Sequence, residues 1–193
     1  MNRTRQGFVA LSLLISSFGM QSQVETDSLL SVSNDSTHVK FQNYFFEALK
    51  QKALENYSKA VDALVLCKSI NPSEPVVFHE LGTNYLKLKQ FENSEYNFQK
   101  AIILDKDNFW YKESLYHLYI AQNRFEDAIS AIAPLLSRHP DYKQDLVNLY
   151  IEAGRYDDAL NVLDDLDKTL GIKASRDKIR TQVYDLSGDE NKR

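Results

Sequence analysis

The residues with the clearest potential for metal chemistry are two histidines and a glutamate. Glu113 precedes His117 by about one helical turn, and His79 lies in an earlier segment. Two imidazoles and a carboxylate form a ligand set that Zn²⁺ or a related transition metal accepts. Their spacing, however, matches no recognised metal signature. A metal-dependent or small-ligand role is therefore the least favoured hypothesis, and we expect neither a metal nor another cofactor.

Covalent catalysis and redox chemistry find no support among the other reactive residue types. Cys67 is the single cysteine, so the chain has no internal disulfide and no Cys-x-x-Cys pair. We find no Ser/His/Asp signature, no glycine-rich phosphate loop and no pair of catalytic carboxylates. We therefore expect no enzymatic activity, and we interpret Cys67 as a small buried residue.

The charge distribution argues against a nucleic-acid partner. The formal net charge is −4, and Lys and Arg are not gathered into a basic cluster. The densest charge is an acidic run, which we interpret as a solvated helix face rather than a cation site. Its members are Asp157, Asp158, Asp164, Asp165 and Asp167.

The elements that position these side chains are predicted to be helices. The chain has 193 residues, enough for one domain with a real core, and 43% of them are hydrophobic. Helix-breaking residues are scarce, with 6 glycines and 4 prolines. Composition alone therefore favours an all-α fold.

The N-terminus has the pattern of a secretory signal peptide. Arg3 and Arg5 precede an apolar run at residues 8–18, and Ser17 and Gly19 are small residues suited to cleavage after Gly19. The run is too short for a transmembrane helix, although an uncleaved anchor is the alternative. We expect a signal peptide at 1–19 and a polar, flexible linker at 20–40. The mature chain would have no stable membrane span and would be periplasmic or extracellular.

A recurring pattern of apolar and small residues organises the rest of the chain. In a unit of 34 residues that begins at Pro75, large apolar or small residues occupy positions 4, 7, 8, 11, 17, 24 and 27. These are Phe78, Leu81, Gly82, Tyr85, Phe91, Phe98 and Ala101. Similar units are found at 41–74, 109–139 and 140–173, and a partial one at 174–188 precedes a tail at 189–193.

This spacing resembles that of the tetratricopeptide repeat (TPR), a helix–turn–helix unit that stacks into a solenoid. The resemblance implies a right-handed, all-α solenoid of antiparallel helix pairs with about four and a half repeats. Gly82 at position 8 implies a close approach of two helices, and Pro134 is expected to kink or weaken the second helix of the third unit. The chain also resembles the small TPR proteins that bacteria export.

The partial fifth unit has two interpretations. It is either a terminal capping helix or a repeat cut short relative to a longer parent. Arg176, Arg180 and Ser187 occupy positions that would face a partner helix in a full repeat. These polar residues favour a cap with a solvated outer face.

The resemblance also implies where a partner would bind. In TPR proteins, positions 2, 5, 9, 12 and 13 of each first helix line a groove that accepts a protein or peptide segment. The corresponding residues here include Phe45, Leu49, Lys52, His79, Thr83, Leu86, Lys87, Trp110, Glu113, His117, Gln144 and Asn148. Trp110 and Phe45 would be aromatic anchors, and packing against neighbouring repeats is the equal alternative for both.

Some TPR modules clamp a C-terminal carboxylate with Lys and Asn at positions 5 and 9 of the first repeat. Phe45 and Leu49 stand at those positions, which disfavours such a clamp. The leading hypothesis is a non-enzymatic scaffold of the cell envelope that binds a protein or peptide in its groove. The alternative is a structural envelope protein that self-associates into a homo-oligomer.

Overall fold

The computed structural model describes residues 36–188. The predicted signal peptide, most of the predicted linker and the tail at 189–193 lie outside the described residues. Within the described part the chain is all-α, without strands. A helical segment at residues 36–53 is followed by α2 (Tyr57–Ile70), α3 (Pro75–Lys87), α4 (Phe91–Leu104), α5 (Phe109–Ala121), α6 (Phe125–Ile132), the 3₁₀ turn η1 (Ala133–Leu135), α7 (Tyr142–Glu152), α8 (Tyr156–Leu170) and α9 (Ala174–Ser187).

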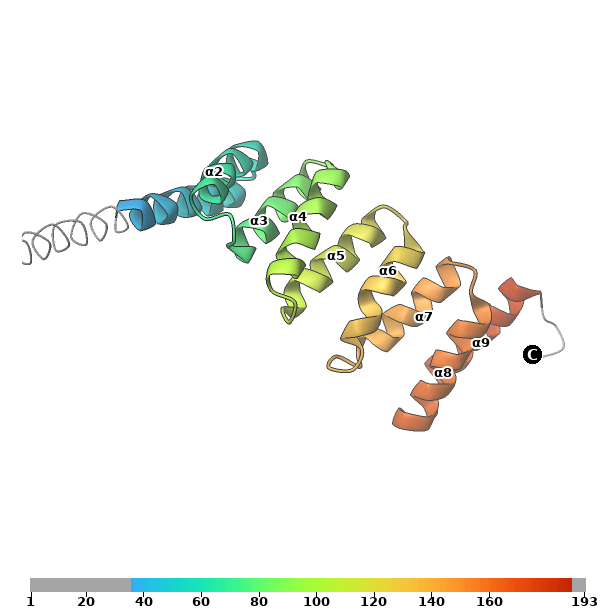
Figure 1. The fold of residues 1–193 in the computed structure, drawn as a ribbon. Helices are drawn as coiled ribbons and strands as arrows, with labels where there is room; N and C mark the ends of the chain where they lie inside the picture. The colour runs from blue at the N-terminus through green and yellow to red at the C-terminus, as the bar shows by residue number, and fades with distance from the viewer. Residues whose placement is uncertain (1–35, 189–193) are drawn as a thin grey trace, which may run out of the picture.

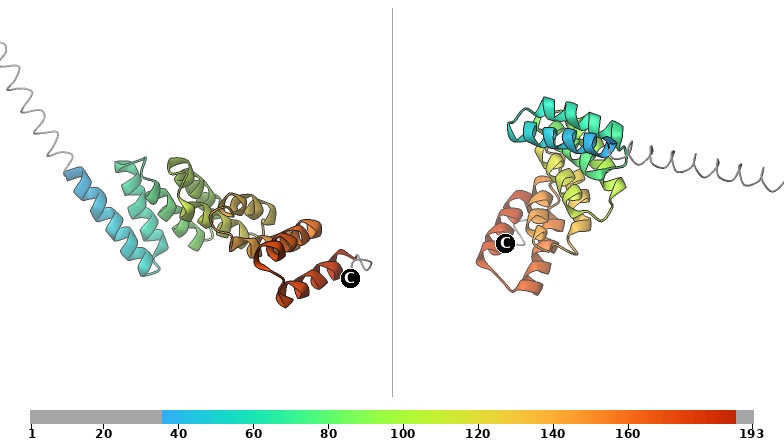
Figure 2. Two further views of the ribbon diagram at one scale, coloured as in Figure 1. Left: turned by 90° about the horizontal axis from the view of Figure 1, so that it is seen from below. Right: turned by 90° about the vertical axis from the view of Figure 1, so that its left-hand side faces the viewer.

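The helices form antiparallel pairs that stack side by side in chain order. Figure 1 shows the stack running from the helical segment 36–53 at one end to α9 at the other, and Figure 2 shows successive pairs turning about its long axis. Each helix contacts its neighbours in sequence, and α3 also contacts α5. The first helices of successive pairs are thus the segment 36–53, α3, α5 and α7. This arrangement is the solenoid that the repeat pattern predicts.

The turn within each pair has the same backbone geometry in all four units. Position 15 has a positive φ in each, from 55° to 71°, at Glu55, Lys89, Asn123 and Gly154. The next residue donates its amide to the carbonyl five residues earlier, at 2.7–2.9 Å. This pairing is that of a Schellman helix ending, which satisfies carbonyl groups at the end of the first helix. The repeat therefore extends to the backbone as well as to the side chains.

Small residues seat the crossing of the two helices in each pair. A Cβ atom at Gly82 would lie 2.6 Å from Cδ1 of Phe98, so the ring of Phe98 occupies the space that a side chain would need. Across the units, position 20 is occupied by fully buried small residues: Ala60, Ser94, Ala128 and Ala159. The predicted close approach at Gly82 is confirmed.

Two local predictions are also confirmed. The α-helix of the third unit stops at Ile132 and continues as the 3₁₀ turn that contains Pro134, which lacks an amide hydrogen for the α-helical ladder. Cys67 is fully buried, and burial raises the pKa of its thiol to about 11. A thiol with so high a pKa carries little of the nucleophilic thiolate at neutral pH.

The helical segment begins before the boundary set from the sequence. Residues 36–40, which the sequence assigns to the flexible linker, are helical. Extending an existing helix by one turn costs far less than nucleating one, so the helix at 41–53 supports these polar residues. None of the helices among residues 36–188 is both long enough and apolar enough to cross a membrane.

The acidic run is not a merely solvated face. Asp164 and Asp167 receive ion pairs from Arg180 and Arg176 of α9, and Asp165 pairs with Lys143 of α7. Arg176 is 5% exposed and also donates to the carbonyl of Gly171. The arginines of the partial unit thus face α8 instead of solvent, and they bind α9 to the end of the stack.

Candidate partner-binding face

We define the first-helix face as the twelve predicted groove residues on the segment 36–53, α3, α5 and α7. The structure buries none of them completely. Lys87, Trp110, His117 and Asn148 are exposed, and the other eight are half-buried. The first-helix face therefore combines half-buried side chains, which pack within the protein, with exposed side chains that a partner can contact.

Its N-terminal part is largely engaged within the protein. Phe45 stacks on Phe41, with ring centroids 6.0 Å apart and planes 6° apart, and it packs against the first core cluster. The Nζ atom of Lys52 lies 2.6 Å from a carboxylate oxygen of Glu80 on α3. For Phe45, packing is therefore the better interpretation, because its half-buried ring lies against this core cluster.

His79 is held as a structural residue between units two and three. Its ring lies 5.6 Å from the ring of Phe98 and 4.9 Å from that of Tyr111. Its Nε2 atom is 2.8 Å from the hydroxyl oxygen of Ser114 on α5. Burial lowers the pKa of His79, an effect opposed by the charge of Glu80 and reinforced by that of Lys52. The lowered pKa favours the neutral imidazole over the charged form in the folded protein.

The three candidate metal ligands are not brought together. His79 contacts Ser114, whereas Glu113 accepts a hydrogen bond from the hydroxyl of Tyr142 on α7. The ring of His117 lies 4.9 Å from that of Tyr116. Within residues 36–188, no group of three or more His, Cys, Asp or Glu side chains is placed to hold a metal ion.

Trp110 is the outermost member of an aromatic cluster between units three and four. Asn108 caps α5 by accepting a 3.1 Å hydrogen bond from the Trp110 amide, which fixes the start of the helix. The indole is 64% exposed and makes an edge contact with Phe109, at 5.2 Å between centroids. Phe109 in turn lies 4.0 Å from the ring of His139 and 5.9 Å from that of Tyr142. Because the indole contacts an aromatic cluster that is already packed, its side chain should lose little conformational entropy when a partner binds.

A pocket of about 410 Å³ lies between the N-terminus of α7 and the C-terminus of α8. Gln144 lines it, together with Pro140, Asp141, Lys143, Leu166, Thr169, Leu170, Lys173 and Arg176. Leu170 is 64% exposed, and Ile172, just beyond it, is 80% exposed. The pocket therefore offers apolar surface beside polar groups at the C-terminal end of the first-helix face.

Leu170 and Lys173 were missed by the sequence analysis. The pattern of groove positions covers only first helices, and these two residues come from the end of α8 and the loop that follows it. An apolar residue directly before Gly171 was the available signal.

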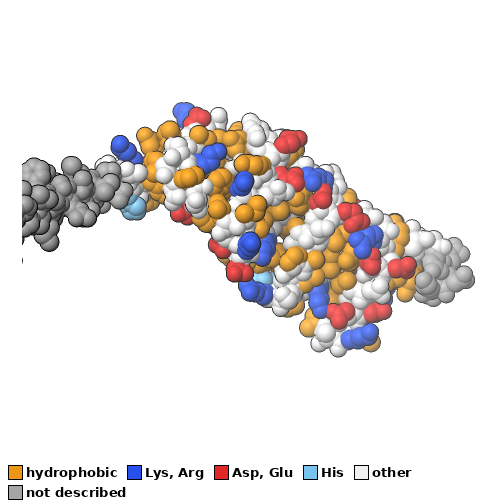
Figure 3. All heavy atoms as spheres, in the orientation of Figure 1, with side chains coloured by type: hydrophobic (Ala, Val, Ile, Leu, Met, Phe, Trp, Pro, Cys, Tyr) orange, Lys and Arg blue, Asp and Glu red, His pale blue; other side chains and the backbone are white. Residues whose placement is uncertain are grey.

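On the face shown in Figure 3, acidic and basic side chains alternate along the solenoid, with hydrophobic surface between them. This face therefore favours mixed apolar and polar contacts with a partner over the electrostatic steering of a strongly charged one.

No family model matches the chain. A stretch of 51 residues, 26% of the chain, is 37% identical to part of the RNA polymerase-associated protein CTR9 of Caenorhabditis elegans. The match spans only 4% of the length of that protein.

Solved structures resemble the fold over much more of the chain. The crystal structure of the MamA protein matches with a TM-score of 0.64 and 15% identity, over 79% of this chain and 85% of that one. The first TPR of Spaghetti (RPAP3) bound to an HSP90 peptide matches with a TM-score of 0.52 and 18% identity, over 57% of this chain and 90% of that one. The TPR2B domain of yeast Sti1 in complex with pHsp70 matches with a TM-score of 0.52 and 16% identity, over 61% of this chain and 98% of that one. Together with the turn that recurs in every unit, these likenesses show that the chain has the tetratricopeptide-repeat fold.

Proposed function

We propose that this chain is a non-enzymatic scaffold that binds a protein or peptide segment on its first-helix face. The observation that carries the proposal is Trp110, an indole 64% exposed on a cluster that joins α5 to α7. Large exposed aromatics on ordered surfaces are typical anchors for a partner chain. Two of the similar solved structures are complexes with an HSP90 peptide and with pHsp70, which supports the same kind of role here.

The binding segment is expected to run from Trp110 toward the pocket beside Leu170. Gln144 of α7 lines that pocket and can hydrogen-bond to a peptide backbone, and Leu170 provides apolar contact. Lys173 makes no ion pair within residues 36–188 and is available to an acidic group. A chaperone-tail clamp is not proposed, since Phe45 and Leu49 replace the required Lys and Asn.

The experiment is affinity capture with wild-type chain and two variants. Trp110→Ala removes the proposed anchor, and Tyr96→Ala removes a matched aromatic that is 54% exposed on the second helix α4. We expect Trp110→Ala to lose the proteins that the wild type enriches and Tyr96→Ala to retain them. Equal enrichment by all three versions would contradict recognition on the first-helix face. Phe45 is left intact because its packing would confuse loss of binding with loss of fold.

We also infer export across a membrane, which rests on the signal pattern at residues 1–19 alone. Mass spectrometry of the protein from cell fractions tests it. We expect a periplasmic or extracellular product that lacks residues 1–19. A full-length product retained with the cytosolic fraction would overturn the inference.

A further inference from the structure

The outer flank of unit one carries a row of exposed apolar side chains. Val39 and Phe46 of the helical segment 36–53 and Leu54 in the turn after it are 50%, 68% and 59% exposed. They are seven and eight residues apart, about two helical turns each, so they form one stripe along the helix. Figure 2 shows this segment as the outermost helix at its end of the described stack.

The later units show which way Phe46 points. It occupies position 6 of unit one, and that position faces the preceding unit in units two and three. In unit two it is Glu80, whose carboxylate lies 2.6 Å from Nζ of Lys52 in unit one. In unit three it is Ser114, whose hydroxyl lies 2.8 Å from Nε2 of His79 in unit two. Phe46 therefore stands where a later unit makes its contact with the unit before it.

The polar residues around the stripe limit what can cover it. Positions 3, 7 and 10 of unit one are Asn43, Glu47 and Lys50, and all three are exposed. The corresponding residues of unit two are buried against unit one: Val77, Leu81 and Asn84. A further repeat stacked on unit one would bury two charged groups and an amide, which is costly without matching partners. The flank therefore suits an occupant that covers the apolar stripe and leaves the polar side chains at its rim.

The stripe is complementary to itself when two copies lie antiparallel. If Phe46 meets Phe46 of the second copy, then Val39 of each copy lies opposite Leu54 of the other to within one residue, because they are seven and eight residues from Phe46. The same register brings Glu47 of each copy within about one helical turn of Lys50 of the other. Opposite charges thus match on both sides of the apolar stripe, as a two-fold interface requires.

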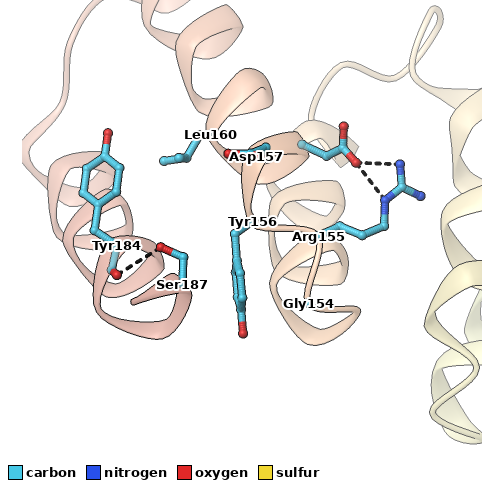
Figure 4. A pocket seen from close by; sticks show the side chains of 8 residues that line it. Gly154, Arg155, Tyr156, Asp157, Leu160, Tyr184 and Ser187 are labelled. Carbon is cyan, nitrogen blue, oxygen red and sulfur yellow. Dashed lines mark hydrogen bonds and ion pairs between the residues drawn. The ribbon is translucent and has the colours of Figure 1, made fainter. Parts of the chain in front are cut away.

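The terminal helix at the other end, α9, does not match the stripe. Among its exposed residues only Leu186 is a large hydrophobic one, and most of the others are polar. Its tyrosine is turned toward its own chain: Figure 4 shows Tyr184 facing Tyr156 across a pocket of about 380 Å³ between α8 and α9. Copies stacked head to tail would place the stripe against polar side chains, whereas a head-to-head pair places it against itself.

We propose that the outer flank of unit one is a homodimer interface, in which the segments 36–53 of two copies pack antiparallel about Phe46. The proposal does not depend on a partner for the first-helix face. A contact along one helix flank buries on the order of 1,000 Å² in total, the low end for a specific interface. Monomer and dimer should therefore be in equilibrium at about micromolar concentration.

Sedimentation velocity of the full chain across a micromolar concentration series measures this equilibrium. We expect the wild type to shift from the mass of one chain to that of two. Phe46→Asp should stay at the mass of one chain throughout, and Tyr96→Asp, at a site on α4 that is 54% exposed, should dimerise like the wild type. A single-chain mass at every concentration, or a dimer that Phe46→Asp retains, would overturn the proposal.

Cysteine cross-linking tests the antiparallel register. Cys67 is fully buried, so an introduced surface thiol is the accessible one. A Val39→Cys chain is mixed with a differently tagged Leu54→Cys chain and oxidised. The mixed disulfide should form faster than either symmetric one. Symmetric Val39→Cys disulfides that form faster would indicate a parallel pair and contradict the proposal.

Alkylation of a Phe46→Cys chain identifies any other occupant. We expect the thiol to react freely at low protein concentration and to become protected as the dimer forms. Protection that is equally strong in dilute monomer would mean that another part of the chain covers the stripe, and the proposal would fail. Trp110→Ala should dimerise like the wild type, so the dimer and partner binding on the first-helix face can be lost separately.

Discussion

The hydroxyl of Ser94 donates a 2.8 Å hydrogen bond to the carbonyl of Gly82 and so joins α4 to α3 at their crossing. Both residues are buried, and Phe98 covers the α-carbon of Gly82 from the same helix as Ser94. The second unit thus uses a polar small residue where the other units use alanine. The contact adds a hydrogen bond to a crossing that already depends on the absence of a side chain.

Gly82→Ala is expected to destabilise the protein by up to about 2 kcal/mol. Alanine gains roughly 1 kcal/mol of helix propensity, but the new Cβ would meet a fully buried ring, and overpacking of that kind costs about 1–3 kcal/mol. Chemical denaturation measures the difference. Adding Phe98→Leu should make the effect of Gly82→Ala smaller; strict additivity of the two changes would contradict the steric account.

Lys89→Gly is expected to stabilise the fold by about 0.5 kcal/mol. Lys89 has a φ of 56°, a conformation that costs a residue with a side chain about 1–2 kcal/mol, and glycine removes that cost while it loses more chain entropy on folding. The control is Lys100→Gly within α4, which should lose about 1 kcal/mol. Destabilisation by both changes would show that the turn is not strained.

Asp167→Asn is expected to weaken the protein at neutral pH and to matter less in acid. Hydrogen bonds from Arg180 and Arg176 lower the pKa of Asp167. Because the folded pKa lies below the unfolded one, the stabilisation is complete above about pH 4 and is lost as the pH falls through the folded pKa. The measurement is the midpoint of thermal unfolding between pH 7 and pH 2. A gap between wild type and variant that is constant with pH would refute this, and Asp177→Asn is the matched control.

Features that depend on the backbone alone were accessible from the sequence. The close crossing at Gly82 and the interruption at Pro134 follow from the absence of a side chain in one case and of an amide hydrogen in the other. Both act within one unit, so the repeat pattern sufficed to place them.

Features that depend on contacts with a neighbouring helix could not be predicted from the sequence. Helical spacing puts Asp164 and Asp167 on one face of α8, but it does not say that Arg176 and Arg180 of α9 cover that face. Likewise, the groove positions of the first helices could not reveal Leu170, which reaches the pocket from the end of a second helix. Which side chains of different units contact one another depends on the tertiary structure. The candidate site is built from several units, so the sequence pattern of one unit could not predict it.

His79 is expected to make the fold more stable at pH 7.5 than at pH 5.5. Burial lowers its folded pKa below the ordinary value of about 6.5, so the unfolded chain binds a proton in the interval where the folded chain does not. Stability must then decline as the pH falls below about 6.5. His79→Phe keeps an aromatic ring and should flatten this decline in urea titrations, whereas His117→Gln, at an exposed site, should preserve it. An unchanged slope in His79→Phe would show that another group titrates.

The most direct measurement of the central claim is photo-cross-linking from the first-helix face in cells. A p-benzoylphenylalanine is introduced at Trp110 in one version and at Tyr96, an aromatic site on α4 that is 54% exposed, in another. If a partner binds on the first-helix face, the photoreactive group at position 110 should give discrete cross-linked protein species, and that at position 96 should give none of them. The same species from both positions, or from position 96 alone, would contradict the account.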